Sequence, residues 1–88
     1  MELVGHVLGA DDHQLRSLQS AQHGAALRIE CARLIRVDFS AAGSVLTWVN
    51  SAKAHGKCIE FVHLPRLVAA FFSLIGINEH ARLTVRAN

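Results

Sequence analysis

Strand-like and helix-like segments alternate along this chain, and glycines follow the helix-like segments. Short apolar or alternating segments that favour strands lie at 3–8, 27–31, 58–62 and 82–86. Each intervening helix-like segment is followed by a glycine suited to the left-handed residue after a helix, namely Gly24, Gly56 or Gly76. Because strand–helix–strand crossovers are right-handed, strands joined by a helix should be parallel. The order predicts an α/β domain.

Polar residues mark the expected starts of the first two helices. The turn 9–12 supplies an N-cap for a short helix that ends at His23–Gly24, with apolar positions at Leu15, Leu18 and Ala21. We expect Ser40 to cap the central helix, because its hydroxyl can accept a hydrogen bond from an unpaired backbone amide. That helix is expected to end at His55–Gly56, and its apolar stripe comprises Ala42, Val45, Leu46, Val49 and Ala52.

The third helix is apolar nearly all round. It opens near Pro65, and its inward face is expected to comprise Leu67, Val68, Phe71, Leu74 and Ile75. The run 67–75 leaves two interpretations open, since either both faces are buried within the domain or one face binds a partner. Alternation places Leu27, Ile29 and Cys31 on one face of the second strand, and Leu83 and Val85 inward on the last.

The size and composition of the chain indicate one folded domain with an interaction surface. The 88 residues are 51% hydrophobic and 18% charged, which is too apolar for a disordered segment. We interpret 1–88 as a single domain. A domain this small buries only about 60–65% of the surface that its unfolded chain exposes, so an unusually apolar one is expected to complete its core against a partner.

Charge and hydropathy argue against nucleic-acid and membrane partners. The net charge is only +2, and the nine Lys and Arg residues are scattered along the sequence. No apolar run reaches the roughly 18 residues of a membrane span, and the opening MELVGH lacks the basic start and apolar core of a signal peptide. We therefore expect no membrane insertion and a cytoplasmic location.

The chemistry-bearing residues form no recognised catalytic or metal motif. The six histidines include no His-x-x-x-His pair, and neither a nucleophile elbow nor a glycine-rich nucleotide loop is present. We expect no enzyme activity, no metal and no cofactor. Cys31 and Cys58 lie in apolar segments and are interpreted as reduced, buried small hydrophobes. His23 and His55 precede helix-ending glycines, where an imidazole can bond the last carbonyls.

Residues 27–43 resemble the signature of STAS domains, the family of anti-sigma-factor antagonists and sulfate-transporter tails. That signature is an apolar strand, a short loop and then Asp-Ser-Ser-Gly-Leu-Gly at the start of a helix. The motif Asp, the two Ser and the two Gly match, without a gap, Asp38, Phe39, Ser40, Ala41 and Gly43. The same register places Gly56 after the motif helix and Gly76–Ile77 at the end of the next helix.

The resemblance covers residues 2–86 and implies a STAS-like fold, a small mixed β-sheet with helices packed mainly on one side. The family's usual first strand is abbreviated or absent ahead of Leu3, which would leave a sheet edge open to pairing or to a second copy in a homodimer. In the family, the loop before the motif helix and its first turns bind a protein partner. The implied docking residues are Asp38, Phe39, Ser40, Ala41, Gly43, Ser44 and Thr47.

The resemblance implies two kinds of partner. In the phosphorylatable antagonists the second Ser of the motif accepts phosphate from a kinase-like anti-sigma factor, and Ser40 fills that position. A phosphate there would lie at a helix N-terminus, which favours an anion. The alternative is a constitutive STAS subunit that binds the ATPase of a bacterial lipid-transport ABC system, which Phe39 favours because it replaces a small polar residue. A small ligand or nucleotide at the same loop is a third hypothesis.

Overall fold

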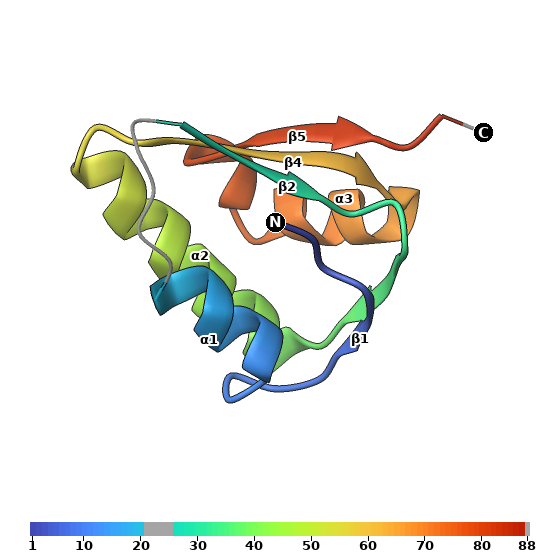
Figure 1. Cartoon of the computed structure of the whole chain (residues 1–88). Helices are drawn as coiled ribbons and strands as arrows, with labels where there is room; N and C mark the ends of the chain where they lie inside the picture. The colour runs from blue at the N-terminus through green and yellow to red at the C-terminus, as the bar shows by residue number, and fades with distance from the viewer. Residues whose placement is uncertain (21–25, 88) are drawn as a thin grey trace.

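The computed structural model describes residues 1–20 and 26–87, and it confirms the α/β class (Figure 1). Along the chain, these residues form β1 (Gly5–Val7), α1 (His13–Ser20), β2 (Ala26–Glu30), β3 (Leu34–Val37), α2 (Phe39–Ala54), β4 (Cys58–Leu64), α3 (Arg66–Leu74), the 3₁₀ helix η1 (Ile77–Glu79) and β5 (Arg82–Val85). The expected end of the first helix at His23–Gly24, together with Ala21, lies outside the described residues.

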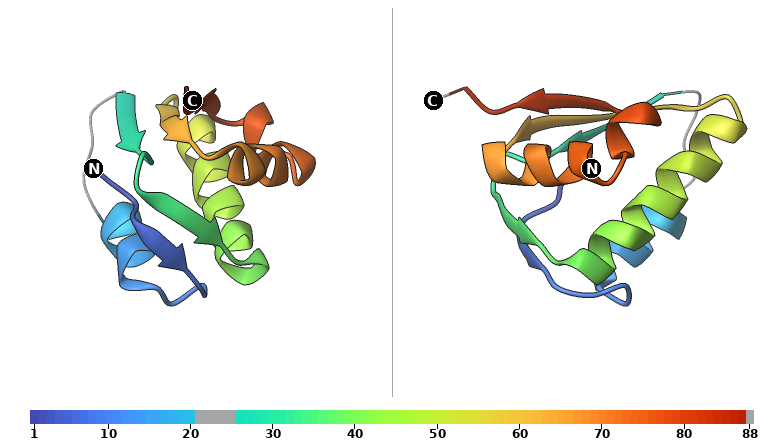
Figure 2. Two further views of the ribbon diagram at one scale, coloured as in Figure 1. Left: turned by 90° about the vertical axis from the view of Figure 1, so that its right-hand side faces the viewer. Right: turned by 180° about the vertical axis from the view of Figure 1, so that it is seen from behind.

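Every strand pair in the described parts of the chain is parallel. One sheet has the order β2-β4-β5, and a second pairs β1 with β3. A bridge between Glu2 and Glu30 links the two sheets. The resemblance implies a mixed sheet, whereas all of these strand pairs are parallel. They are parallel because the two strands of each pair are joined by a crossover that contains a helix. All three helices lie on the same face of the β2-β4-β5 sheet, as predicted (Figure 2).

Strand β3 is missing from the sequence-based prediction, which places no strand between 31 and 58. Leu34 and Val37 are buried while Ile35 and Arg36 are exposed, so the strand lacks the alternation by which strands are recognised. The turn before β3 is closed by a hydrogen bond from the Leu34 amide to the Cys31 carbonyl, 3.1 Å. This turn directs the chain away from β4 and toward β1.

The hydrophobic core lies between the β2-β4-β5 sheet and the helices. At its centre the rings of Phe61 on β4 and Phe72 on α3 meet edge to face, with centroids 5.6 Å apart and neither side chain exposed. The predicted inward face of β2 is confirmed, because Ile29 and Cys31 are buried and Leu27 packs against the core. The buried side chains of α2 are Ala41, Ala42, Val45, Val49 and Ala52.

The predicted end of α2 is confirmed, but its predicted start is wrong. His55 is the C-terminal cap with its Nδ1 2.8 Å from the Ser51 carbonyl, and Gly56 has φ 76°. The N-cap is Asp38 rather than Ser40, and the Ala42 amide donates to the Asp38 carbonyl at 2.8 Å. The Asp38 amide donates to Val7 at the end of β1, which holds residue 38 extended and starts the helix directly after it.

Ser40 therefore has no capping role to lose. We expect Ser40→Ala to change the free energy of unfolding by less than about 0.5 kcal/mol, as for an ordinary surface substitution. Gly56→Ala is the positive control, because a left-handed φ of 76° costs a non-glycine residue about 1 kcal/mol or more. Both values come from chemical denaturation. A loss of 1 kcal/mol or more in Ser40→Ala would restore Ser40 as a cap.

Two expectations for apolar faces near the C-terminus are wrong. Helix α3 buries Val68, Ala69 and Phe72, whereas Leu67 and Leu74, expected inward, are 86% and 85% exposed. In a helix that is apolar nearly all round, no polar face identifies which side packs inward. Val85 is 45% exposed because it lies on the edge strand β5, beyond a bulge in β4 between Phe61 and Leu64.

Candidate functional site

The expected docking residues gather where β3 passes into α2. Asp38 lies between the two elements, and its backbone amide donates a hydrogen bond of 2.9 Å to the Val7 carbonyl on β1. Its Oδ1 is buried and lies 2.9 Å from Nε of Arg36, an ion pair that lacks hydrogen-bond geometry. The carboxylate is therefore directed toward β3 rather than toward the first amides of α2.

The next docking residues form one stripe along α2. Ser40, Gly43 and Thr47 are exposed and Ser44 is half-buried, at the spacing that places residues on one helix face. Together with Gln19, Trp48 and Ser51 they line a shallow groove of about 550 Å³. Ala41 does not belong to this surface. Its side chain is fully buried on the inner face of α2, so no side-chain atom of Ala41 is open to a partner in the isolated domain.

Phe39 adds a large apolar group beside this groove. Its side chain is 76% exposed, and its ring centroid lies 6.3 Å from that of Phe71 on α3. Leu67 and Leu74 lie four residues before and three residues after Phe71, so helical spacing places all three on one face of α3. We refer to Phe39, Leu67, Phe71 and Leu74 as the apolar surface. One face of the run 67–75 is thus exposed, which excludes burial of both faces within the domain, and binding of a partner by this face stays a prediction.

A comparison with known protein families identifies the family to which this domain belongs. The model of a family described as Mlab, STAS domain matches residues 1–85. The chain belongs to the STAS domain family. None of the curated proteins and none of the solved structures matches it. The family match confirms the resemblance found in residues 27–43 and the STAS-like fold. STAS domains are generally non-enzymatic modules of interaction and regulation, so the match supports a general role of that kind.

Several residues at the surface of this STAS domain are not identified by its sequence motif. The three α3 residues of the apolar surface are absent from the motif, although the apolar run 67–75 indicates that one face could be exposed. Trp48 is also missed. It is half-buried, packs against the core and borders the groove on α2. No sequence feature separates this tryptophan from an ordinary core residue.

Cys31, Cys58 and Glu30 belong neither to the groove on α2 nor to the apolar surface. Burial, with Glu30 and Glu2 nearby, raises the pKa of the Cys31 thiol to about 12, so that sulfur stays protonated and unreactive at neutral pH. Cys58 is exposed, which corrects the expectation that both cysteines are buried, and both are free. A hydrogen bond with His63, whose Nδ1 lies 2.8 Å away, lowers the pKa of Glu30.

Within residues 1–20 and 26–87, no group of three or more His, Cys, Asp and Glu side chains is placed to hold a metal ion. No helix in the same residues has both the length and the apolar character needed to cross a membrane.

Proposed function

We propose that this STAS domain binds a protein partner through the start of α2 and the exposed face of α3. The observation that carries the proposal is the apolar surface. Phe39 is 76% exposed and packs against Phe71, and the surface continues to Leu67 and Leu74, 86% and 85% exposed. Single exposed apolar residues are ordinary, whereas a group of neighbouring large ones is typical of an interaction site.

The arrangement resembles the centre and rim of a protein interface. Burying one such side chain completely in a partner is worth about 1.5–3 kcal/mol, and aromatic anchors commonly dominate interface energies. The hydroxyl-bearing stripe from Ser40 to Thr47 lies on the same helix as Phe39 and provides polar groups beside the apolar centre. The surface is tested by measuring partner affinity after truncation of Phe39.

The partner that we favour is a kinase-like anti-sigma factor, with phosphorylation of Ser40 as the switch. Ser40 is exposed in the first turn of α2, whose first intrahelical bond comes from the Ala42 amide. The amides of residues 39–41 therefore have no acceptor within the helix and favour an anion nearby. A phosphate on Ser40 would also carry about two negative charges next to Phe39, which opposes burial of that ring in a partner.

The second candidate is a constitutive STAS subunit bound to the ATPase of a bacterial lipid-transport ABC system. Two observations favour it. The matching family is described as Mlab, STAS domain, and the position beside Ser40 holds the exposed apolar Phe39 where the phosphorylatable antagonists have a small polar residue. A large exposed apolar group suits a partner that stays bound.

Phosphorylation separates the two candidates. With its cognate serine kinase, the domain is expected to gain one phosphate, and Ser40→Ala should abolish that modification while the fold is retained. Intact-mass spectrometry gives the stoichiometry, and peptide mapping gives the position. Ser44→Ala is the matched control, since Ser44 lies one turn on in the same groove and should leave the modification unchanged. Phosphate only at other residues would contradict the switch and favour the constitutive subunit.

A further inference from the structure

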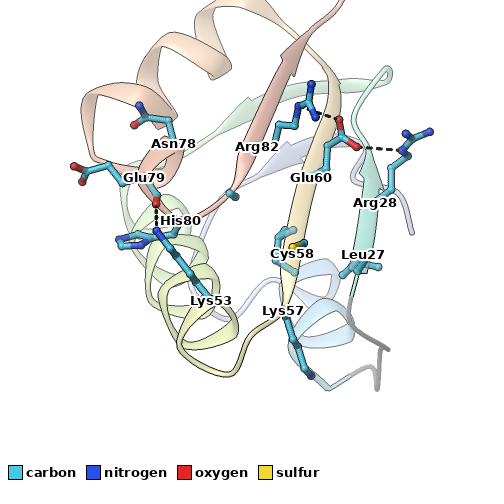
Figure 3. A pocket seen from close by; sticks show the side chains of 13 residues that line it. Leu27, Arg28, Lys53, Lys57, Cys58, Glu60, Asn78, Glu79, His80 and Arg82 are labelled. Atoms are coloured by element: carbon cyan, nitrogen blue, oxygen red, sulfur yellow. Dashed lines mark hydrogen bonds and ion pairs between the residues drawn. The ribbon is translucent and has the colours of Figure 1, made fainter.

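A second hollow lies at the other end of α2, outside the surface proposed for the protein partner (Figure 3). It has a volume of about 830 Å³ and is formed where β2, β4 and β5 begin, next to Lys53 in the last turn of α2 and to the segment after α3. Lys53 and Ser40 are 13 positions apart on α2, which corresponds to about 20 Å along the helix axis. A ligand in this hollow would therefore be distant from Ser40.

The cavity gathers positive charge that is scattered along the sequence. Its lining includes four cationic side chains, Arg28, Lys53, Lys57 and Arg82, and two acidic ones, Glu60 and Glu79. These six residues carry 4 − 2 = +2, and the formal net charge of the whole chain is also +2. The entire positive excess of the protein is thus located here, and an anion would be attracted to this end of the molecule.

The polar groups of the lining are only partly occupied by one another. Glu60 lies between Arg28 and Arg82, with N···O distances of 3.4 and 3.8 Å, so one carboxylate faces two guanidinium groups (Figure 3). Lys53 donates from Nζ to the Glu79 carbonyl at 2.7 Å, while Lys57 has no ion-pair partner among residues 1–20 and 26–87. Nδ1 of His80 is buried without a hydrogen-bond partner in the same part of the structure.

Besides the charged side chains, the lining includes the polar Asn78 and His80, and the rest of it is apolar. The apolar residues are Ala26, Leu27, Cys58, Ile59 and Ala81. A bare inorganic anion would use the cationic groups but leave this apolar area in contact with water. A neutral apolar molecule would gain the apolar contacts but would desolvate the cations without pairing them. Ligand cavities typically measure about 300–1,000 Å³ and combine apolar walls with a few polar groups, as this one does.

We propose that this cavity binds a small organic anion that has a phosphate or carboxylate head and an alkyl tail. The head is bound beside Lys57, and the tail covers the apolar lining around Leu27 and Ile59. Arg28 and Arg82 gather around Glu60, away from the Lys57 side chain, and add to the positive field at this end of the molecule (Figure 3). Such a molecule could be free in solution or part of a lipid surface, and the experiment distinguishes these sources.

The probe is octyl phosphate below its micelle concentration, titrated into the complete chain and followed by calorimetry and by backbone amide NMR. We expect saturable one-to-one binding, with shifts concentrated in residues 26–28, 57–60 and 78–82. Lys57→Glu should weaken binding at least tenfold. Arg16→Glu is the matched control, because it makes the same change in net charge on α1, away from the cavity, and it should change affinity less than twofold. Lys57→Ala serves if Lys57→Glu does not fold, and should weaken binding at least threefold.

Several results would overturn the proposal. An affinity for octanol equal to that for octyl phosphate would show that the charged head does not contribute to binding. An affinity for inorganic phosphate equal to that for octyl phosphate would show that the tail does not contribute. Equal losses in the Lys57 and Arg16 variants would indicate a general charge effect. Shifts centred on Phe39 and α3 would place the probe on the apolar surface instead. A last result separates the two sources and does not overturn the proposal: binding to vesicles containing phosphatidic acid, without binding to monomeric octyl phosphate, would show that a lipid surface presents the head and tail.

Discussion

Truncation of Phe39 to alanine should lower the affinity for the protein partner at least tenfold, equivalent to about 1.4 kcal/mol, while changing the free energy of unfolding by less than about 1 kcal/mol. The two effects separate because the side chain is 76% exposed in the isolated domain and contributes little to the core. Calorimetry with the purified partner and denaturation of the same variant measure both quantities.

Leu67→Ala tests the α3 half of the same surface. Leu67 is 86% exposed and lies one turn before Phe71, so its truncation should also weaken binding without unfolding the domain. Val85→Ala is the control for a general loss of exposed apolar area, because Val85 is exposed on β5 and is not part of the apolar surface. Unchanged affinity in both the Phe39 and Leu67 variants would contradict the proposal that the apolar surface binds the partner. Loss of folding with unchanged binding per folded molecule would make Phe39 a core residue.

The local features of the fold could be predicted from the sequence because local rules determine them. Gly56 and Gly76 both take left-handed backbone angles after helices, with φ 76° and 97°, as their positions indicate. The start of α2 could not be predicted from local rules alone. Asp and Ser are about equally good capping residues, so residue type does not choose between Asp38 and Ser40. The Asp38 amide donates to the Val7 carbonyl of a distant strand, and this contact decides where the helix begins.

Strand β3 and the rotation of α3 show the same limit. Leu34 and Val37 point inward with two exposed residues between them, because a turn separates β3 from β2 and a different strand pairs with it. The orientation of α3 depends on which of its apolar sides meets β4. Phe72 does so through its contact with Phe61, and this leaves Leu67 and Leu74 on the opposite side. Sequence periodicity contains neither piece of information.

The candidate sites differ in how far the sequence could reveal them. The motif places Ser40, Gly43 and Thr47 on one exposed helix face, and its alignment identifies them without a structure. The cationic cavity could not be found in this way. Arg28, Lys57 and Arg82 are far apart in the chain, and they come together only because β2, β4 and β5 are parallel neighbours that begin at the same edge of the sheet.

The largest expected loss of stability is in Phe72→Ala, at about 3–5 kcal/mol. Phe72 is fully buried and its ring meets that of Phe61 edge to face, so truncation removes apolar contacts and leaves a cavity that the surrounding helices cannot close. The total free energy of unfolding of a domain is expected to be only about 5–15 kcal/mol. Chemical denaturation gives the value directly.

Leu74→Ala is the matched control for Phe72→Ala, because it truncates an apolar residue of the same helix that is 85% exposed. It should change the free energy of unfolding by less than about 0.5 kcal/mol. The two variants are also expected to differ in binding. Phe72→Ala should lower partner binding only in proportion to the unfolded fraction, whereas Leu74→Ala should lower the affinity of the folded molecule. Similar losses of stability in both variants would mean that both sides of α3 are packed, and the apolar surface would then not be available to a partner.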